Sequence, residues 1–147
     1  MRIYADTNIY ARPFDDYSQP RIFLEGEAAL LIFKAVSQKR FSLITSDILK
    51  LEIERSLEPK KIQMESFLEL SGKHIFQSKN VLSLARKIFK TCKIPPRDAI
   101  HLASAKIGKA KYFLTCDDDI LKKDYCLEKY FCLKVANPLQ FILFKKL

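Results

Sequence analysis

Short runs with the pattern of β-strands alternate with longer helix-like stretches, and this alternation constrains the fold more than any other feature of the sequence. The expected strands are residues 2–5, 41–45, 111–115 and 133–136, with residues 74–76 as either a further strand or a loop. The expected helices are residues 20–39, 46–58, 60–70 and 98–107, one that begins at Ser78 or Asn80, and an apolar helix at the end of the chain. Such alternation is typical of a parallel sheet that helices cover on both faces. We therefore expect an α/β fold in which residues 1–147 form a single domain, with a mostly parallel sheet of roughly four to five strands flanked by helices.

Glycine and cysteine usage excludes several other classes of protein. The chain contains three glycines, and none lies in a phosphate-binding loop of the dinucleotide or P-loop type, which argues against nucleotide-cofactor folds. The cysteines contain no C-x-x-C pair and are predicted to be reduced thiols rather than a disulfide framework or a zinc site. They are Cys92, Cys116, Cys126 and Cys132.

The charge balance suits a polyanionic partner. Lysine and arginine total 26 against 17 acidic residues, giving a net charge of +9, which favours nucleic acid without identifying it. No apolar run approaches the roughly 20 residues that cross a bilayer. The N-terminus enters the first predicted strand without the pattern of a signal peptide. We therefore expect a soluble, cytoplasmic protein with no membrane partner.

Acidic residues follow the ends of the predicted strands. Asp6 comes directly after the first strand, the run Asp117–Asp119 follows the strand at 111–115, and Asp98 lies in the first turn of the preceding helix. Parallel α/β sheets bind ligands at the carboxyl ends of their strands. Singly, each acid has an ordinary alternative role as a helix cap or a solvated loop residue. Together, carboxylates about 4 Å apart repel by roughly 4 kcal/mol at an effective dielectric constant of about 20, and Mg²⁺ or Mn²⁺ would remove that repulsion.

A further acid, Glu52, lies on the second predicted helix. Leu49, Ile53 and Leu57 recur at every fourth position and form the apolar stripe of that helix. At about 100° per residue, Glu52 borders the stripe, whereas Glu54 lies on the far side. A carboxylate that faces the protein body needs an arginine, a backbone cap or a metal as its partner. Glu52 is therefore a candidate metal ligand, and Glu54 is predicted to face solvent.

Four short segments carry a family pattern and occur in that family's order. They are Ile3–Ile9, Thr45–Ser46 with Glu52 six residues after the serine, Asp98–Ala105 and Phe113–Asp117, and Asn137–Pro138 extends the likeness. In these segments the chain resembles the PIN-domain nucleases, in particular the small single-domain members that include toxins of toxin-antitoxin pairs. The resemblance implies a parallel sheet with flanking helices, and Mg²⁺- or Mn²⁺-dependent hydrolysis of RNA phosphodiester bonds.

The resemblance also implies roles for individual residues and partners. By position, Asp6, Glu52, Asp98 and Asp117 match the acidic quartet that holds metal and carries catalysis, with Asn8 and Thr115 as polar supports. The run of aspartates leaves the fourth acid open among Asp117, Asp118 and Asp119. The implied partners are RNA, an antitoxin protein and a second copy of the chain in a homodimer.

Two other functions are compatible with the same residues. A binding module on this fold would hold RNA or protein without cleavage, and only the complete acidic set argues against it. A phosphoacceptor signalling domain also gathers aspartates at strand ends. Such domains have adjacent acids after the first strand and a lysine after the last, whereas here Asp6 is followed by Thr7–Asn8 and the last strand by Asn137–Pro138.

Neither histidine is assigned a catalytic role. His101 lies one turn after Asp98, where a packing or surface role is favoured over contact with substrate. Arg12, Lys50 and Arg97 lie near the site segments, and the solvated role is favoured over phosphate binding for each of them.

Overall fold

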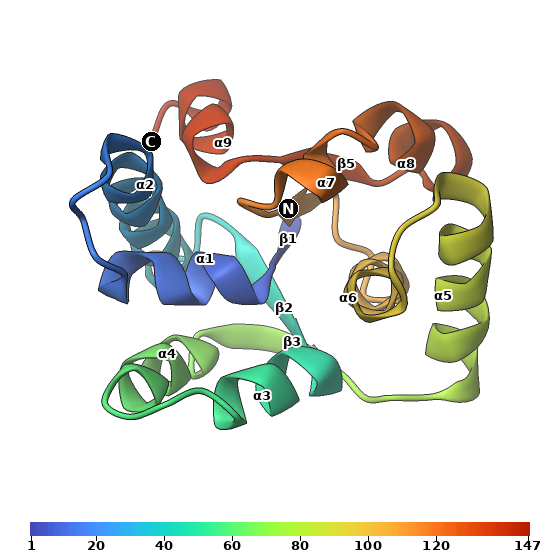
Figure 1. The fold of residues 1–147 in the computed structure, drawn as a ribbon, viewed down its shortest axis with the longest axis horizontal. Helices are drawn as coiled ribbons and strands as arrows, with labels where there is room; N and C mark the ends of the chain where they lie inside the picture. The colour runs from blue at the N-terminus through green and yellow to red at the C-terminus, as the bar shows by residue number, and fades with distance from the viewer.

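The computed structural model of the protein describes residues 1–147 as a five-stranded sheet between two layers of helices (Figure 1). The strands are β1 (Arg2–Ala5), β2 (Ser42–Ser46), β3 (Ser71–Ile75), β4 (Tyr112–Leu114) and β5 (Lys134–Ala136). All neighbouring strands are parallel, and their order across the sheet is β3-β2-β1-β4-β5. The structure therefore confirms the predicted α/β fold with a parallel sheet flanked by helices.

The helices form one layer on each face of the sheet. One layer contains α1 (Thr7–Ala11), the 3-10 helix η1 (Arg12–Phe14), α2 (Pro20–Ser37), α3 (Asp47–Glu54), α4 (Lys60–Leu68) and α9 (Pro138–Lys145). The other contains α5 (Lys79–Cys92), α6 (Pro96–Ile107), α7 (Asp118–Leu121) and α8 (Asp124–Phe131). Successive side chains of a strand point to opposite faces, so Ile3 and Ala5 pack in the first layer and Tyr4 packs in the second. No helix combines the length and the apolar composition that a membrane crossing needs.

Several elements differ from the prediction. The helix expected to reach residue 58 ends at Glu54. Leu57 therefore lies beyond the helix, outside its apolar stripe, and is 85% exposed. Ser71 and Gly72, which directly follow the helix expected at residues 60–70, begin β3. This strand pairs with β2 and resolves the alternative at residues 74–76 in favour of a strand. Helices α1, α7 and α8 are absent from the prediction.

The cysteines also differ from the prediction. Cys92 at the end of α5 and Cys126 on α8 form a disulfide, so the expectation of reduced thiols is wrong for this pair. The reason is tertiary, because α5 and α8 pack against each other on the same face of the sheet. Cys116 and Cys132 carry free thiols.

Candidate active site

The central position of β1 places Asp6 at the middle of the carboxyl edge of the sheet. β1 lies between β2 and β4, so the residue after it adjoins the ends of both neighbours. Asp6 is that residue, and its carboxylate also caps α1, where the backbone N of Thr7 donates to Oδ1 at 2.8 Å. The turn from strand to helix therefore orients this carboxylate.

Neutral donors hold the second oxygen of Asp6. Thr115 donates to Oδ2 through its hydroxyl at 2.8 Å, and Asn8 Nδ2 donates to the same oxygen at 3.2 Å. The Asn8 amide is fixed in turn, because its Oδ1 accepts from the backbone N of Cys116 at 3.0 Å. Asp6 is 6% exposed, and burial raises its pKa above the usual value although His101, the Thr115 hydroxyl and the backbone N–H of Thr7 oppose the shift. No lysine or arginine pairs with this buried acid.

Glu52 approaches Asp6 from α3. Ser46 caps this helix by accepting from the backbone N of Leu49 at 3.2 Å. Leu49 and Ile53 are buried beneath it, which leaves Glu52 half-buried and Glu54 exposed. The predicted phase of the helix therefore places these two acids on the sides expected.

Three side chains surround the Glu52 carboxylate. Thr7 Oγ1 donates to Oε1, His101 Nε2 lies 2.6 Å from the same oxygen, and Arg97 Nε lies 3.3 Å from Oε2. Burial alone would raise the pKa of Glu52. The hydrogen bond and the charge of His101 outweigh burial, so the pKa is lowered overall. Glu52 is thus held ionised by its neighbours.

His101 is the site residue to which the sequence analysis assigned no catalytic role. It is 1% exposed, its Nδ1 lies 2.7 Å from Tyr4 Oη, and its Nε2 lies 3.9 Å from Asp6 Oδ1. Burial lowers the pKa of His101, but the carboxylates of Glu52, Asp6 and Asp98 outweigh it and raise the pKa overall. Its position one turn after Asp98 is visible in the sequence, but its contact with Glu52, which lies 49 residues away, is not. The burial of His101 agrees with the predicted packing role, but the side chain also contacts Glu52, a candidate metal ligand.

The charges of other acids act on Asp98. It lies half-buried in the first turn of α6. Burial raises the pKa of Asp98 to about 6, and the charges of Asp6 and Asp117 add to that shift. The charges of Asp6 and Asp117 thus act on Asp98, but Asp98 does not belong to the group of ligand atoms within 4.8 Å of one another, which comes from Asp6, Glu52 and His101.

The three consecutive aspartates have different surroundings. Asp117 caps α7, where its Oδ1 accepts from the backbone N of Asp119 at 2.9 Å, and its own backbone N donates to Thr115 Oγ1 at 3.1 Å. Asp118 is exposed, and Arg21 donates to both of its oxygens at 2.8 and 2.9 Å, which lowers the pKa of Asp118. The side chain of Asp119 is 86% exposed. Among the three, Asp117 is the one whose charge is a leading cause of the raised pKa of Asp98.

The donor set fits a hard divalent cation. Asp6, Glu52 and His101 each offer one ligand atom, and these atoms lie within 4.8 Å of one another. Both ring nitrogens of His101 already face hydrogen-bonding partners, which suits it to orienting Glu52 rather than to ligating metal. The remaining donors are carboxylate oxygens, which Mg²⁺ and Mn²⁺ prefer.

A second buried acid lies nearby and has cations of its own. Glu25 on α2 is fully buried, and Arg12 and Arg21 each donate to it through Nε at 3.1 Å. Asn137, after β5, donates to Oε2 at 2.6 Å. Arg12 also pairs with Asp15. The structure therefore gives Arg12 two carboxylate partners, where the sequence favoured a solvated role.

Comparison with known proteins adds two findings. A family model described as PIN domain matches residues 3–124. The crystal structure of VapBC2 from Rickettsia felis, bound to a DNA fragment from their promoter, contains a chain with a similar fold, with a TM-score of 0.59 and 15% sequence identity. The match covers 93% of this chain and 98% of that one. No curated protein matches the chain.

Proposed function

Because the chain belongs to the PIN domain family, whose members are generally nucleases, we propose that it is an endoribonuclease that hydrolyses RNA phosphodiester bonds with Mg²⁺ or Mn²⁺. The observation that carries this proposal is the acidic cluster around Asp6, which contains a buried carboxylate without a lysine or arginine partner. The net charge of +9 supports a polyanionic substrate. In this proposal residues 1–147 act as one catalytic domain.

We assign the metal to four carboxylates, Asp6, Glu52, Asp98 and Asp117. A bound divalent cation would lower the pKa of a water molecule and neutralise charge on the phosphate. Asn8 and Thr115 hold Asp6 in place, and His101 orients Glu52. Asp117 takes the fourth position because Asp118 is paired with Arg21. Asp119 is its alternative, since its exposed side chain lies on the same turn.

The test is cleavage of an end-labelled single-stranded RNA by the purified protein. We expect cleavage in Mn²⁺ or Mg²⁺ and none in excess chelator, with Asp6→Asn protein as the control for a contaminating nuclease. Unchanged cleavage in chelator would refute the metal. Binding without cleavage in either metal would favour the binding module, and stoichiometric phosphorylation of Asp6 by a small phosphodonor would favour the signalling domain.

We also propose that the chain works with protein partners, namely an antitoxin and a second copy of itself, in the cytoplasm. Apolar side chains on two neighbouring helices support such partners. On α2, Phe23 and Leu24 are 43% and 47% exposed; on α9, Leu143 and Phe144 are 74% and 64% exposed. Exposed apolar surface of this kind marks interaction sites. Light scattering tests the homodimer, and a monomeric mass that does not change with concentration would refute it.

A further inference from the structure

A cavity of about 330 Å³ adjoins the acidic site on the side of Glu52. One wall is a stripe on α3 at positions i, i+3, i+4 and i+7, which share one face of a helix. This stripe consists of Ile48, Leu51 and Glu52 with Arg55, the residue that follows the last turn of α3, and the cavity is completed by Thr7 of α1 and Arg97 of α6. We call it the α3–α6 cavity. Because Glu52 belongs to both, the cavity opens directly beside the acidic site.

The two arginines give this cavity unused capacity to bind an anion. Arg55 is exposed and forms no ion pair or side-chain hydrogen bond within the protein. Arg97 uses only Nε, which faces Glu52 at 3.3 Å, and its two terminal NH₂ groups have no protein partner. A guanidinium presents its donors in a planar fork that matches phosphate oxygens. On the side away from Glu52, the donors of both arginines therefore face no acidic group of the protein.

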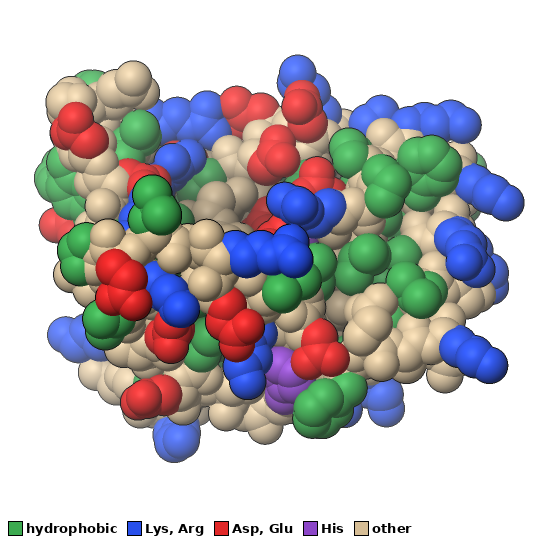
Figure 2. Space-filling model, turned by 60° about the horizontal axis from the view of Figure 1, so that its bottom comes forward, with side chains coloured by type: hydrophobic (Ala, Val, Ile, Leu, Met, Phe, Trp, Pro, Cys, Tyr) green, Lys and Arg blue, Asp and Glu red, His purple; other side chains and the backbone are tan.

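The remaining lining is apolar, which suits one nucleotide. Ile48 is half-buried and Leu51 is 40% exposed, so both present carbon surface to the cavity. Figure 2 shows the face that carries α3 and α4, where Lys and Arg, hydrophobic, and Asp and Glu side chains adjoin near the middle. The volume lies near the lower end of the range for small-molecule sites. It is suited to a sugar and base attached to a phosphate, rather than to a double helix.

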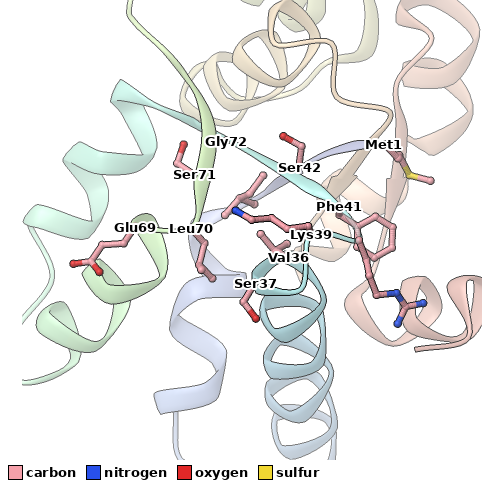
Figure 3. A pocket seen from close by; sticks show the side chains of 12 residues that line it. Met1, Val36, Ser37, Lys39, Phe41, Ser42, Glu69, Leu70, Ser71 and Gly72 are labelled. Atoms are coloured by element: carbon pink, nitrogen blue, oxygen red, sulfur yellow. The ribbon is translucent and has the colours of Figure 1, made fainter.

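Other hollows lack this combination. On the opposite side of α3, a cavity of about 370 Å³ is lined by Asp47 and His74, but His74 Nε2 lies 2.8 Å from Asp47 and its Nδ1 lies 2.9 Å from Thr45. Its histidine and aspartate thus satisfy each other, and its one cation is Lys50, which lacks the planar fork of a guanidinium. The hollow in Figure 3, lined by Lys39 and Arg40, lies at the amino ends of β1 and β2, the edge of the sheet opposite Asp6.

We propose that the α3–α6 cavity binds one nucleotide of the RNA strand beside the phosphodiester bond to be cleaved. This inference rests on the proposed function and adds a substrate subsite to it. Arg55 contacts a backbone phosphate, the free NH₂ groups of Arg97 face the phosphate nearer Glu52, and Ile48 and Leu51 contact the sugar or base. The subsite favours single-stranded RNA, because a paired base could not enter it.

The test compares Arg55→Ala with Arg40→Ala, which removes the same charge from an exposed arginine at the opposite edge of the sheet. Both changes are made in Asp6→Asn protein so that the RNA stays intact, and thermal melting checks folding. The affinity for a short single-stranded RNA is measured by fluorescence anisotropy at several salt concentrations. We expect Arg55→Ala to weaken binding at least about tenfold and to reduce the slope of log K against log salt by about 0.7. Arg40→Ala should change the affinity less than about twofold.

Cleavage kinetics and a competing ligand complete the test. In otherwise wild-type protein with Mn²⁺, Arg55→Ala should raise KM and leave kcat almost unchanged, because a subsite binds substrate and transition state alike. Equal RNA affinities for Arg55→Ala and Arg40→Ala would overturn the subsite. So would an Arg55→Ala protein that loses affinity only for an oligoglutamate peptide, since the cavity would then serve an acidic protein segment. RNA binding that depends on Arg55 in a protein that cleaves no RNA would retain the subsite and refute the proposed function.

Discussion

Two buried carboxylates at the carboxyl edge of the sheet, Asp6 and Glu25, have opposite electrostatic surroundings. Glu25 is fully buried between two guanidinium groups, of Arg12 and Arg21, and a side-chain amide completes its shell. Asp6 is 6% exposed, and its direct partners are a hydroxyl, an amide and a backbone N–H. The nearest ionisable base is His101, whose Nε2 lies 3.9 Å away and faces Glu52 more closely.

This difference separates an acid whose charge is compensated within the chain from one whose charge is not. A buried charge is costly unless it is paired, and Glu25 is paired within the chain. Asp6 is oriented as firmly but its charge is under-compensated, which its raised pKa reflects. A divalent cation would supply the missing charge. We therefore expect burial without a cationic partner, rather than burial alone, to distinguish a metal-binding acid.

Asp6→Asn should give the largest effect on activity. The amide is nearly isosteric and retains the cap of α1, but it lacks the negative charge that would hold metal. We expect cleavage to fall by about a thousandfold, which corresponds to roughly 4 kcal/mol of transition-state stabilisation. The melting temperature should change little, because the removal of an under-compensated buried charge offsets the hydrogen bonds that the amide NH₂ cannot accept. Initial rates in Mn²⁺ and a thermal melt check both parts, and wild-type cleavage by this variant would remove Asp6 from the site.

Glu25→Gln should produce the reverse result. The substitution leaves two guanidinium groups facing an amide, so we expect the free energy of unfolding to fall by about 3 kcal/mol. Cleavage per folded molecule should change little. Urea denaturation measures the loss, with Glu27→Gln, an exposed acid on the same helix, as the matched control. A stable Glu25→Gln protein with no activity would reverse the comparison and place Glu25 in the functional site.

The parts of the fold that the sequence predicted are those whose signal is local. Strands buried on both faces read as continuous apolar runs, and Ile3, Tyr4 and Ala5 are all fully buried. Helices α7 and α8 were not predicted because each buries a single residue, Ile120 in α7 and Leu127 in α8. One buried residue in a helix leaves no periodicity to detect.

The same division applies to the candidate site. Asp6, Asp98 and Asp117 could be proposed from the sequence because each follows a strand or opens a helix. The role of His101 was missed because its partner, Glu52, lies 49 residues away in the sequence. The disulfide was missed for the same reason, since Cys92 and Cys126 are 34 residues apart. Pairings between distant segments need the arrangement of the helices, which a pattern along one sequence does not contain.

Glu52 and Glu54 extend the comparison to two identical side chains on one helix. Glu52 touches Thr7 and His101, whereas Glu54 is exposed and pairs with no cation. We expect Glu52→Gln to weaken metal-dependent cleavage by at least about tenfold, in line with the loss of a metal-orienting group. Glu54→Gln should alter neither cleavage nor melting temperature. Rates over a range of Mn²⁺ concentrations decide the matter, and a larger defect in the Glu54 variant would exclude Glu52 as the second acid.

The smallest effect should separate Asp117 from Asp118, two adjacent acids of which one is already paired. Arg21 donates to both oxygens of Asp118. The charge of Asp118 is therefore neutralised within the protein, as that of Glu25 is. We expect Asp117→Asn to weaken Mn²⁺ binding about fivefold, or roughly 1 kcal/mol, and Asp118→Asn to leave it unchanged. Asparagine caps a helix as well as aspartate does, so Asp117→Asn keeps α7 intact and a lost affinity would report the charge. Calorimetric titration with MnCl₂ measures both variants, with Asp119→Asn beside them. Equal losses at all three positions would mean that the negative potential of the loop, rather than one oriented carboxylate, attracts the cation, and the distinction between paired and unpaired acids would then not extend to exposed residues.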